Sequence, residues 1–408
     1  MKKSRFLFLI LLTLAASAQK KQSVKSPSPD DYFPPAGSWE KHLPVDFGFD
    51  TAKLNDAIRF VINHETKLPI DLGLAQAMSF GKEPFDEVLG PMADRAGPSG
   101  IIVYKGYIIA EWGEPSKVDI TNSVTKSFLS SVVGVAVDQG LIVSIKDKVV
   151  SYMPPVEAYD PGHNSGFSDS HLFYPFASEH NRLLDWEVML RQTSDWEGEM
   201  WGKPDWADRP DADSGKWLNR KRNPPGSVWK YNDVRVNALA LAATCVWRRP
   251  LPAVLKEYIM DPIGASSTWR WYGYRNSWIV LDGSPVQSVS GGGHWGGGMF
   301  INSYDMARFG LLSLHKGKWK GRQLISESWI QQSLTPTTAE PTYGFMNYFL
   351  NTDRKFLPSA PASAFAHEGN GTNIIYVDPE HQLVVVARWI EHNALDSMVE
   401  KIIGALHP

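Results

Sequence analysis

The chain has 408 residues, of which 43% are hydrophobic and 21% are charged, and these proportions are typical of a water-soluble globular protein. A chain of this length forms one large domain or two interleaved ones. The formal net charge is −3 and no basic cluster is present, which excludes the charge pattern of a nucleic-acid-binding protein.

The first residues have the pattern of a secretory signal peptide over residues 1–18. Basic residues at positions 2, 3 and 5 precede an apolar run over 6–14, and small residues follow at 16–18. A membrane anchor fits less well, because the apolar run is far shorter than the ~20 residues that a spanning helix needs. We therefore expect a periplasmic or secreted bacterial protein without stable membrane insertion. Its net charge becomes −6 when the three positive charges of the peptide are removed (−3 − 3).

The next segments predict a linker, a helix and a hairpin. Residues 19–44 are rich in Pro, Ser and Lys, as in a linker. Apolar residues recur at helical spacing over 50–65. Two β-rich runs around Lys105-Gly106, within 100–113, indicate a β-hairpin. A long apolar helix is then expected from Ser123 onward, and Gly140 is placed to end it.

Helical patterns and long Pro-, Gly- and Asp-rich loops alternate from 145 to 280, where β-rich runs are scarce. A glycine-rich run over 288–298 permits close backbone approach, and Ser303 is expected to cap a helix over 304–314. Near the end of the chain, residues 373–389 predict a strand, a turn at Asp378-Pro379 and a second strand. A helix over 394–406 follows.

Strands therefore lie at both ends of the chain and helices lie in the middle. This order predicts an α+β fold, in which residues 45–120 and 285–408 form one antiparallel sheet flanked by the terminal helices. A mostly helical lobe, about 121–284, is inserted between these parts, and the cleft between two lobes is a common place for a ligand. The single cysteine, Cys245, lies in an apolar helical run, so we expect a packed thiol and no internal disulfide.

Ser123 and Lys126 stand three residues apart at the start of the long predicted helix. This spacing places both on one helix face, so that the amine can approach the hydroxyl. The helix N-terminus adds free backbone N–H groups and partial positive charge, and burial favours a neutral amine that can act as a base. Five other serines have the same spacing to a lysine, and taken alone the pair fits a helix cap with a surface lysine better. A lysine in the first turn, however, opposes the helix dipole.

Two later segments make the Ser123 motif more specific, because they follow it in a known order. The segment "PPGSVWKYNDVRVNALALAA" contains Tyr231-Asn232-Asp233, and "AFAHEGNGTNIIYVDPEHQLVVVA" contains His367-Glu368-Gly369. Together with the glycine-rich run, these motifs resemble those of serine β-lactamases and penicillin-binding proteins over about residues 95–408. The likeness is to the class C β-lactamase-related branch, which includes esterases, D-aminopeptidases and aminohexanoate-dimer hydrolases.

The resemblance implies a β-lactamase/transpeptidase-like fold and a role for each motif residue. Ser123 would be the acylated nucleophile, and Lys126 and Tyr231 would share its proton, with the charge of Lys126 favouring the tyrosinate. The backbone N–H groups of Ser123 and Asn370 would form the oxyanion hole. His367 would line the cleft and hold substrate or assist proton transfer. The residues implied for oxyanion and substrate binding are Asn370, Gly369, His367 and Asp233. No metal or organic cofactor is implied.

Two departures from the family pattern argue against efficient β-lactam hydrolysis. Asp233 stands where lactamases have an asparagine, and a carboxylate does not donate to a substrate carbonyl unless it is protonated. Asp233 is a candidate partner for Lys126 instead. His367 replaces a lysine, whose permanent charge would attract the carboxylate of a β-lactam.

The sequence thus predicts an exported serine hydrolase that cleaves a small ester, amide or peptide substrate, and it makes no prediction about the oligomeric state. A D-amino-acid peptidase or DD-peptidase acting on cell-wall fragments, a weak β-lactamase and a non-catalytic penicillin-binding-like sensor remain as alternatives. The Trp- and Asp-rich segment over 195–217 is interpreted as a wall of the cleft, with a sugar platform or a calcium loop as further alternatives.

Overall fold

A computed structural model describes residues 32–159, 172–210 and 220–406, and the structural statements below refer to these ranges. The predicted signal peptide, the first part of the linker and residues 211–217 of the Trp- and Asp-rich segment lie outside the described residues. So do residues 160–171, a Gly- and Ser-rich stretch with His163 and His171 that the sequence predicts to be a solvated loop.

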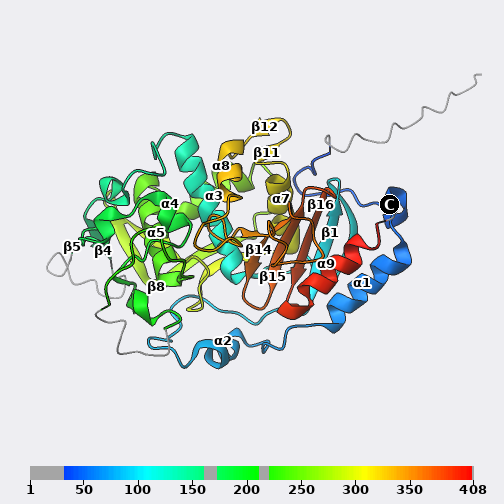
Figure 1. Cartoon of the computed structure of the whole chain (residues 1–408), viewed down its shortest axis with the longest axis horizontal. Coiled ribbons are helices and arrows are strands. Elements are labelled where there is room, and N and C mark those ends of the chain that lie inside the picture. The colour runs from blue at the N-terminus through cyan, green and yellow to red at the C-terminus, as the bar shows by residue number, and fades with distance from the viewer. Residues whose placement is uncertain (1–31, 160–171, 211–219, 407–408) are drawn as a thin grey trace, which may run out of the picture.

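A six-stranded antiparallel sheet forms one half of the molecule (Figure 1). Its strand order is β13-β14-β15-β16-β1-β2, so the two ends of the chain meet where β16 pairs with β1. The prediction that both chain ends build one antiparallel sheet is therefore confirmed. The strands are β1 (Ser99–Tyr104), β2 (Tyr107–Trp112), β13 (Phe349–Leu350), β14 (Phe365–Gly369), β15 (Asn373–Asp378) and β16 (Leu383–Arg388).

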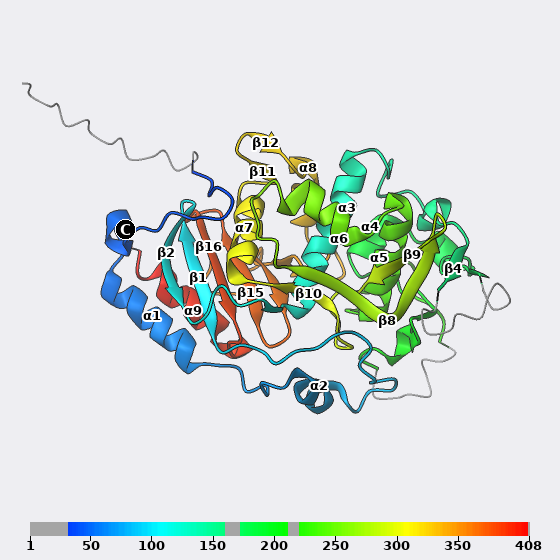
Figure 2. The same cartoon turned by 180° about the vertical axis from the view of Figure 1, so that it is seen from behind.

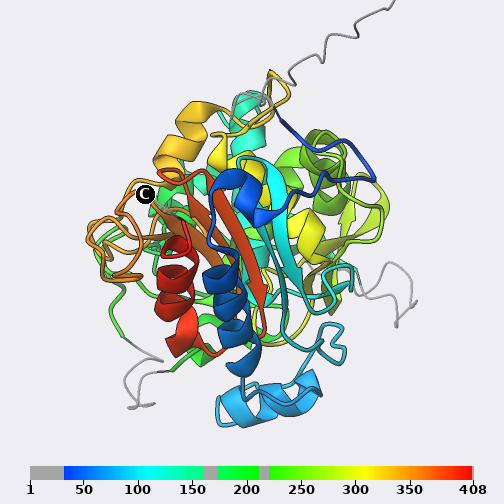
Figure 3. The same ribbon diagram turned by 90° about the vertical axis from the view of Figure 1, so that its right-hand side faces the viewer.

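Helices cover both faces of this sheet. On the outer face, α1 (Thr51–Asn63) and α9 (Leu395–Ile403) lie side by side (Figure 3) and bury an apolar cluster that includes Leu54, Ile374 and Met398. On the inner face, α7 (Ser303–Leu314) packs against β15 and β16. Burial on both faces explains why β15 and β16 are nearly continuous apolar runs rather than alternating ones.

The other half contains the predicted middle helices: α3 (Thr125–Asp138), α4 (Trp186–Leu190), α5 (Asp233–Trp247) and α6 (Leu251–Leu255). It also contains a second antiparallel sheet, of order β3-β10-β8-β4-β5 with β9 paired to β8, which the sequence analysis did not predict (Figure 2). The strands are β3 (Asp119–Ile120), β4 (Val156–Ala158), β5 (Leu172–Phe173), β8 (Arg270–Leu281), β9 (Ser284–Val289) and β10 (Gly298–Ile301).

Several short elements complete the described chain. They are α2 (Leu72–Phe80), α8 (Glu327–Ser333), and the strand pairs β6 (Glu199–Met200) with β7 (Lys203–Pro204) and β11 (Lys318–Trp319) with β12 (Arg322–Gln323). We call residues 64–98, which include α2, the strap, because they run from α1 along the molecule to the second half (Figure 1). Within the described ranges, no helix is both long enough and apolar enough to cross a bilayer.

Local signals determine most element boundaries. The Asp50 side chain caps α1 by accepting from two backbone N–H groups of its first turn. The expected end of the Ser123 helix is also confirmed, because Gly140 follows α3 with a φ of 71°. The predicted cap of α7 is wrong. Asn302 accepts the N–H of Asp305 and is the cap, whereas Ser303 is the first helical residue.

Cys245 is buried in α5, and burial raises the pKa of its thiol to about 12. The reactive thiolate is therefore disfavoured, as expected for a packed cysteine. The described part of the predicted linker lies on the protein body. Tyr32 stacks on Tyr107 with ring centroids 4.1 Å apart, and the buried Arg308 donates to three carbonyls of this segment, those of Pro34, Pro35 and Ser38.

Candidate active site

Ser123 lies in a single 3-10 turn, η2 (Asn122–Val124), between β3 and α3. The turn is tied to the second sheet through Thr125, whose hydroxyl donates to the Asn122 carbonyl (2.6 Å) and accepts the N–H of Met299 in β10 (2.9 Å). Ser123 is half-buried, whereas Lys126, one turn further on, has 0% exposure. Part of Ser123 is thus exposed to solvent, whereas Lys126 is not.

Lys126 lies at the centre of the site. Its Nζ is 2.9 Å from Ser123 Oγ, 2.6 Å from Asp233 Oδ1 and 3.2 Å from the Gly291 carbonyl oxygen. The same Nζ is 5.0 Å from the ring centroid of Tyr231. The structure therefore brings together the serine, lysine and tyrosine of the sequence motifs, and it pairs Asp233 with Lys126.

Asp233 is the first residue of α5, where a carboxylate interacts favourably with the helix dipole. Asn232 precedes it and caps the helix by accepting the N–H of Arg235 at 3.0 Å. Burial opposes the charge of Asp233, but Lys126, Arg209 and His294 outweigh burial and hold the pKa of Asp233 well below its usual value. Asp233 is therefore a carboxylate and has no proton to donate to a substrate carbonyl.

The phenol of Tyr231 faces Ser123 and Asn347. Its Oη donates to Asn347 Oδ1 at 3.3 Å. Burial, followed by the charge of Asp233, raises the pKa of Tyr231 above its ordinary value, while a hydrogen bond with the Ser123 hydroxyl acts in the opposite direction. The protonated phenol is favoured, so the expectation of a tyrosinate is wrong for the unliganded site. The physical reasons are the burial of the phenol and the nearby negative charge of Asp233, which also pairs with Lys126.

The hairpin that joins β14 to β15 brings Gly369 and Asn370 against the Ser123 turn. A Cβ atom on Gly369 would lie 2.0 Å from the Thr121 carbonyl oxygen and 3.0 Å from the Ser123 nitrogen, so this approach requires glycine. Asn122 Nδ2 donates to the Asn370 carbonyl at 2.9 Å. The backbone amides of Ser123 and Asn370 thus belong to contacting segments, as an oxyanion hole requires.

His367 lies in the core, with 0% exposure. Its ring packs against Phe309, Tyr348 and Phe365, with centroid distances of 5.4, 4.6 and 5.7 Å. Burial lowers the pKa of His367 to about 3, so the imidazole is neutral. The expected role of lining the cleft and holding substrate does not fit this position, because aromatic side chains cover the ring.

The described part of the Trp- and Asp-rich segment is held by ion pairs with arginines. Asp195 and Asp205 lie 2.6 and 3.0 Å from the guanidinium of Arg235 in α5. Trp196 is buried beside them. These contacts agree with its interpretation as a packed wall, since protein cations and not an open ligand shell face the carboxylates.

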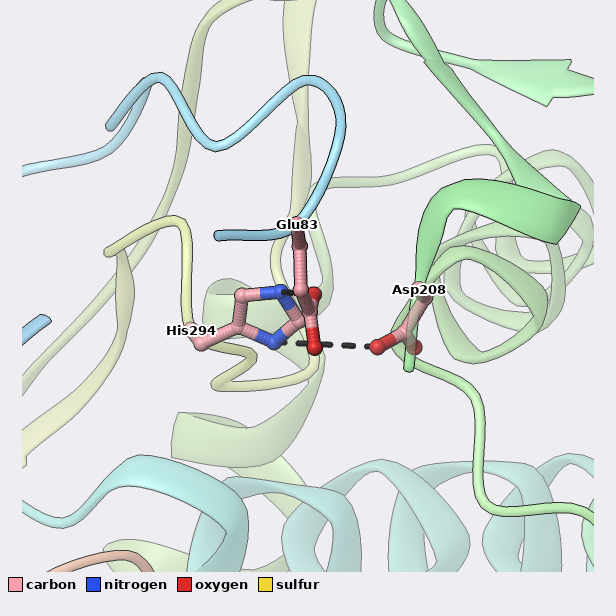
Figure 4. A group of neighbouring side chains, drawn as sticks. All are labelled: Glu83, Asp208 and His294. Atoms are coloured by element: carbon pink, nitrogen blue, oxygen red, sulfur yellow. Dashed lines mark ion pairs between the residues drawn. The ribbon is translucent and has the colours of Figure 1, made fainter. Parts of the chain in front are cut away.

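Four residues next to the site have no motif in the sequence: Glu83, Asp208, Arg209 and His294. His294 Nε2 is 2.9 Å from Glu83 Oε2, and His294 Nδ1 is 3.8 Å from Asp208 Oδ1 (Figure 4). The same Nδ1 is 3.2 Å from Asp233 Oδ2. Arg209 Nη1 is 2.5 Å from Asp208 and 3.0 Å from Asp233 Oδ2. They come from the strap, the segment before α5 and the glycine-rich run, so only folding brings them together.

Ligand atoms of Glu83, Asp208 and His294 all lie within 4.8 Å of one another, a closeness that a metal site also requires. In the structure, however, these groups already face one another and protein cations. Arg209 bridges Asp208 and Asp233, and both ring nitrogens of His294 face carboxylate oxygens. We therefore treat the group as an ion-pair network around Asp233.

A cavity of about 300 Å³ lies elsewhere, between the segment at 37–41 and the start of α7. Trp39, Tyr304 and Arg308 are among the residues that line it, and the residues of the Ser123 site do not. It therefore has no part in the chemistry described here.

Fold and site together have the arrangement of the β-lactamase-fold serine hydrolase family. The antiparallel sheet and the second lobe meet at the turn that carries Ser123 and leads to Lys126. Tyr231 and the Gly369 end of β14 complete the site. The chain belongs to the beta-lactamase family, whose model, described as "Beta-lactamase", matches residues 120–389. The matched segment contains Ser123, Lys126, Tyr231 and the Gly369–Asn370 hairpin.

Solved structures share this fold at low sequence identity. A family VIII carboxylesterase is 15% identical with a TM-score of 0.53, over 87% of this chain and 97% of its own. EstCE1, a hydrolase with promiscuous acyltransferase activity, is 13% identical with a TM-score of 0.53, over 88% and 99%. A penicillin-binding protein homolog from Caulobacter crescentus is 15% identical with a TM-score of 0.52, over 86% and 96%. A search of curated proteins finds no match.

Proposed function

We propose that this protein is an exported hydrolase that cleaves an ester or amide bond through an acyl intermediate on Ser123. One observation carries the proposal: Lys126 Nζ lies 2.9 Å from Ser123 Oγ and 5.0 Å from the ring centroid of Tyr231. A serine hydroxyl beside an amine and a phenol is an activated nucleophile with two groups that can carry its proton. Export is proposed from the signal-peptide pattern of residues 1–18.

The proposed reaction begins when Ser123 Oγ attacks the substrate carbonyl carbon and its proton passes to the neutral amine of Lys126. Asp233 stabilises the ammonium that forms, because its carboxylate is 2.6 Å away. The N–H groups of Ser123 and Asn370 stabilise the tetrahedral oxyanion. When the intermediate collapses, the phenol of Tyr231 protonates the leaving group and regains a proton from Lys126. Water then attacks the acyl ester in the same way, with Ser123 as the leaving group.

The charges near Ser123 favour uncharged esters and amides over β-lactams. His367 stands in place of the family's lysine, and it is buried and neutral. Arg209 is a cation close to Tyr231, but it is already paired with Asp208 and Asp233. The described residues thus provide no unpaired cation at these positions for the carboxylate of a β-lactam, and we propose a carboxylesterase or small-amide hydrolase.

The proposal is tested by incubating the mature protein with a fluorophosphonate and locating the adduct by mass spectrometry, alongside hydrolysis of a p-nitrophenyl ester. We expect one adduct on Ser123, and no adduct and no turnover in Ser123→Ala and Lys126→Ala. Ser227→Ala is the matched control, because Ser227 has the same spacing to Lys230 but is exposed. Folded protein without an adduct on Ser123 would overturn the proposal and favour a non-catalytic binder.

A further inference from the structure

Three cations share the buried carboxylate of Asp233. Lys126 faces Oδ1 at 2.6 Å, whereas Arg209 and His294 face Oδ2 at 3.0 and 3.2 Å. The side chain of Asp233 has only 2% exposure, so water does little to screen these contacts. How strongly Asp233 stabilises the ammonium of Lys126 therefore depends on which groups contact its other oxygen.

His294 is enclosed from several elements and has 5% exposure. Its ring stacks on Phe80 of α2, with centroids 4.3 Å apart, and contacts Trp295 at 4.2 Å. The charged groups that face it are Glu83 of the strap and Asp208 (Figure 4), together with Asp233 of α5. Two further cations lie near these rings. Arg209 Cζ is 5.5 Å from the ring centroid of Phe80, and Lys203 Nζ is 5.3 Å from the ring centroid of Trp295.

This environment favours a protonated imidazole. Burial opposes the charge, but hydrogen bonds to Asp233 and Glu83 and the nearby charge of Asp208 outweigh burial and raise the pKa of His294. In the protonated form, Nδ1 donates to Asp233 Oδ2 at 3.2 Å, and Nε2 forms an ion pair with Glu83 Oε2 at 2.9 Å. Glu83 and Asp233 then face a cationic ring, whereas burial raises the pKa of the third acid, Asp208.

The chemistry at Ser123 needs the opposite charge state at Lys126. An amine accepts the Ser123 proton only when it is neutral, but a nearby carboxylate stabilises the ammonium. If Lys126 were the only partner of Asp233, the full carboxylate charge would hold the proton on the amine. Each cation on Oδ2 weakens that hold, because it lowers the negative potential at Lys126.

We propose that His294 is a positioning residue for the Ser123–Lys126 pair: held between Glu83 and Asp233, it draws the Asp233 carboxylate charge away from Lys126 and leaves the amine free to act as a base. The inference rests on the proposed function. It also gives the strap a role, since Glu83 anchors the far side of the imidazole and connects the strap to the nucleophile.

The test measures the rate at which a fluorophosphonate labels Ser123 between pH 5 and 10, in the wild type and in His294→Gln. The rate rises with pH as the amine loses its proton. Glutamine keeps a hydrogen-bonding side chain but cannot carry a charge, so we expect the midpoint of the rise to move to higher pH by about one unit, with a similar rate at high pH. Below the midpoint, the variant should label about tenfold more slowly.

Two further variants complete the test: one should shift the midpoint in the opposite direction, and the other replaces His294→Gln if that variant unfolds. Asp233→Asn removes the carboxylate that holds the proton on Lys126, so its midpoint should move the opposite way, to lower pH. Glu83→Gln should move the midpoint in the same direction as His294→Gln but by less. Glu83 is more exposed than His294, at 14% against 2% for the side chains, so this variant decides the question if His294→Gln unfolds.

The control is His381→Gln. His381 also pairs with a carboxylate, with Nδ1 2.7 Å from Asp378 Oδ2, but at the end of β15 that lies away from Asn370. We expect its profile to match the wild type. An unmoved midpoint in His294→Gln, or an equal loss of rate at every pH, would overturn the inference while leaving the labelling of Ser123 intact.

Two other results would also overturn it. Loss of labelling in EDTA with recovery on adding Zn²⁺ alone would assign the cluster to a metal instead. Absence of any Ser123 adduct in the folded wild type would refute the proposed function itself, and the inference with it.

Discussion

The contact between β14 and the Ser123 turn depends on the absence of a side chain at Gly369. A Cβ atom there would lie 2.0 Å from the Thr121 carbonyl oxygen and 3.0 Å from the Ser123 nitrogen. Gly369→Ala must therefore separate the two segments by about 1 Å, and a misplacement of this size at a reacting centre costs about 10²-fold in rate. The overpacking should reduce the free energy of unfolding by about 1–3 kcal/mol.

The rate of fluorophosphonate labelling at Ser123 and the midpoint of urea unfolding measure these two effects separately. Gly134→Ala is a matched control. Gly134 lies in the second half of α3, and a Cβ atom on it would lie 2.5 Å from Trp329 Nε1 of α8. This position is about 14 Å along the helix axis from Thr125. We expect a similar loss of stability in the control, but labelling within about twofold of the wild type.

A Gly369→Ala protein that labels at the wild-type rate would refute the reasoning, since the two segments would then not need close contact for reactivity. Equal losses of labelling in both variants would also refute it, because general destabilisation would then explain the effect.

Two further predictions concern the tyrosine and the buried histidine. Tyr231→Phe removes the hydroxyl that returns a proton to the leaving group in the proposed reaction, so ester turnover should fall by about 10²–10⁴-fold with little change in the urea midpoint. Near-normal turnover would remove Tyr231 from the mechanism. The pKa of His367 is lowered to about 3 by burial, so the unfolded chain binds one more proton than the native protein as the pH falls from 6.5 toward 3. The free energy of unfolding should therefore drop by up to about 1.4 kcal/mol per pH unit in that window. In His367→Leu, the free energy of unfolding, measured with urea at pH 7, 6, 5 and 4, should fall less steeply with decreasing pH. The same slope in both proteins would mean that His367 is not buried in its neutral form.

The hairpins illustrate what local sequence can predict. Lys105-Gly106 was identified as a turn, and its φ values of 51° and 85° are those that this dipeptide allows. Asp282-Gly283 is an equally strong signal, with φ values of 52° and 80°, but the sequence analysis does not predict the β8–β9 hairpin that it joins. The strand β8 has an irregular register between Gly273 and Trp278, which breaks the alternation that identifies a strand.

The candidate site also has residues that the sequence places correctly and residues that it does not. The motif residues Ser123, Lys126 and Tyr231 could be placed together because their spacing and order along the chain carry chemical meaning. His367 could not be placed from its motif, since whether a strand residue faces a cleft or the core depends on what covers it, here Tyr348 and Phe309. The charge state of Tyr231 likewise depends on Asp233, which lies beside Lys126 only in the folded chain.

By itself, the sequence determined the motif residues and their order, the antiparallel pairing of the two chain ends, and the long helix that follows Ser123. These properties follow from residue type and short-range periodicity. Only the tertiary structure decided which oxygen of Asp233 meets Lys126 and which meets His294, and that Glu83 reaches the same network from the strap. The physical reason is that electrostatic interactions in a buried site depend on distances between segments far apart in the chain, and neither composition nor spacing contains those distances.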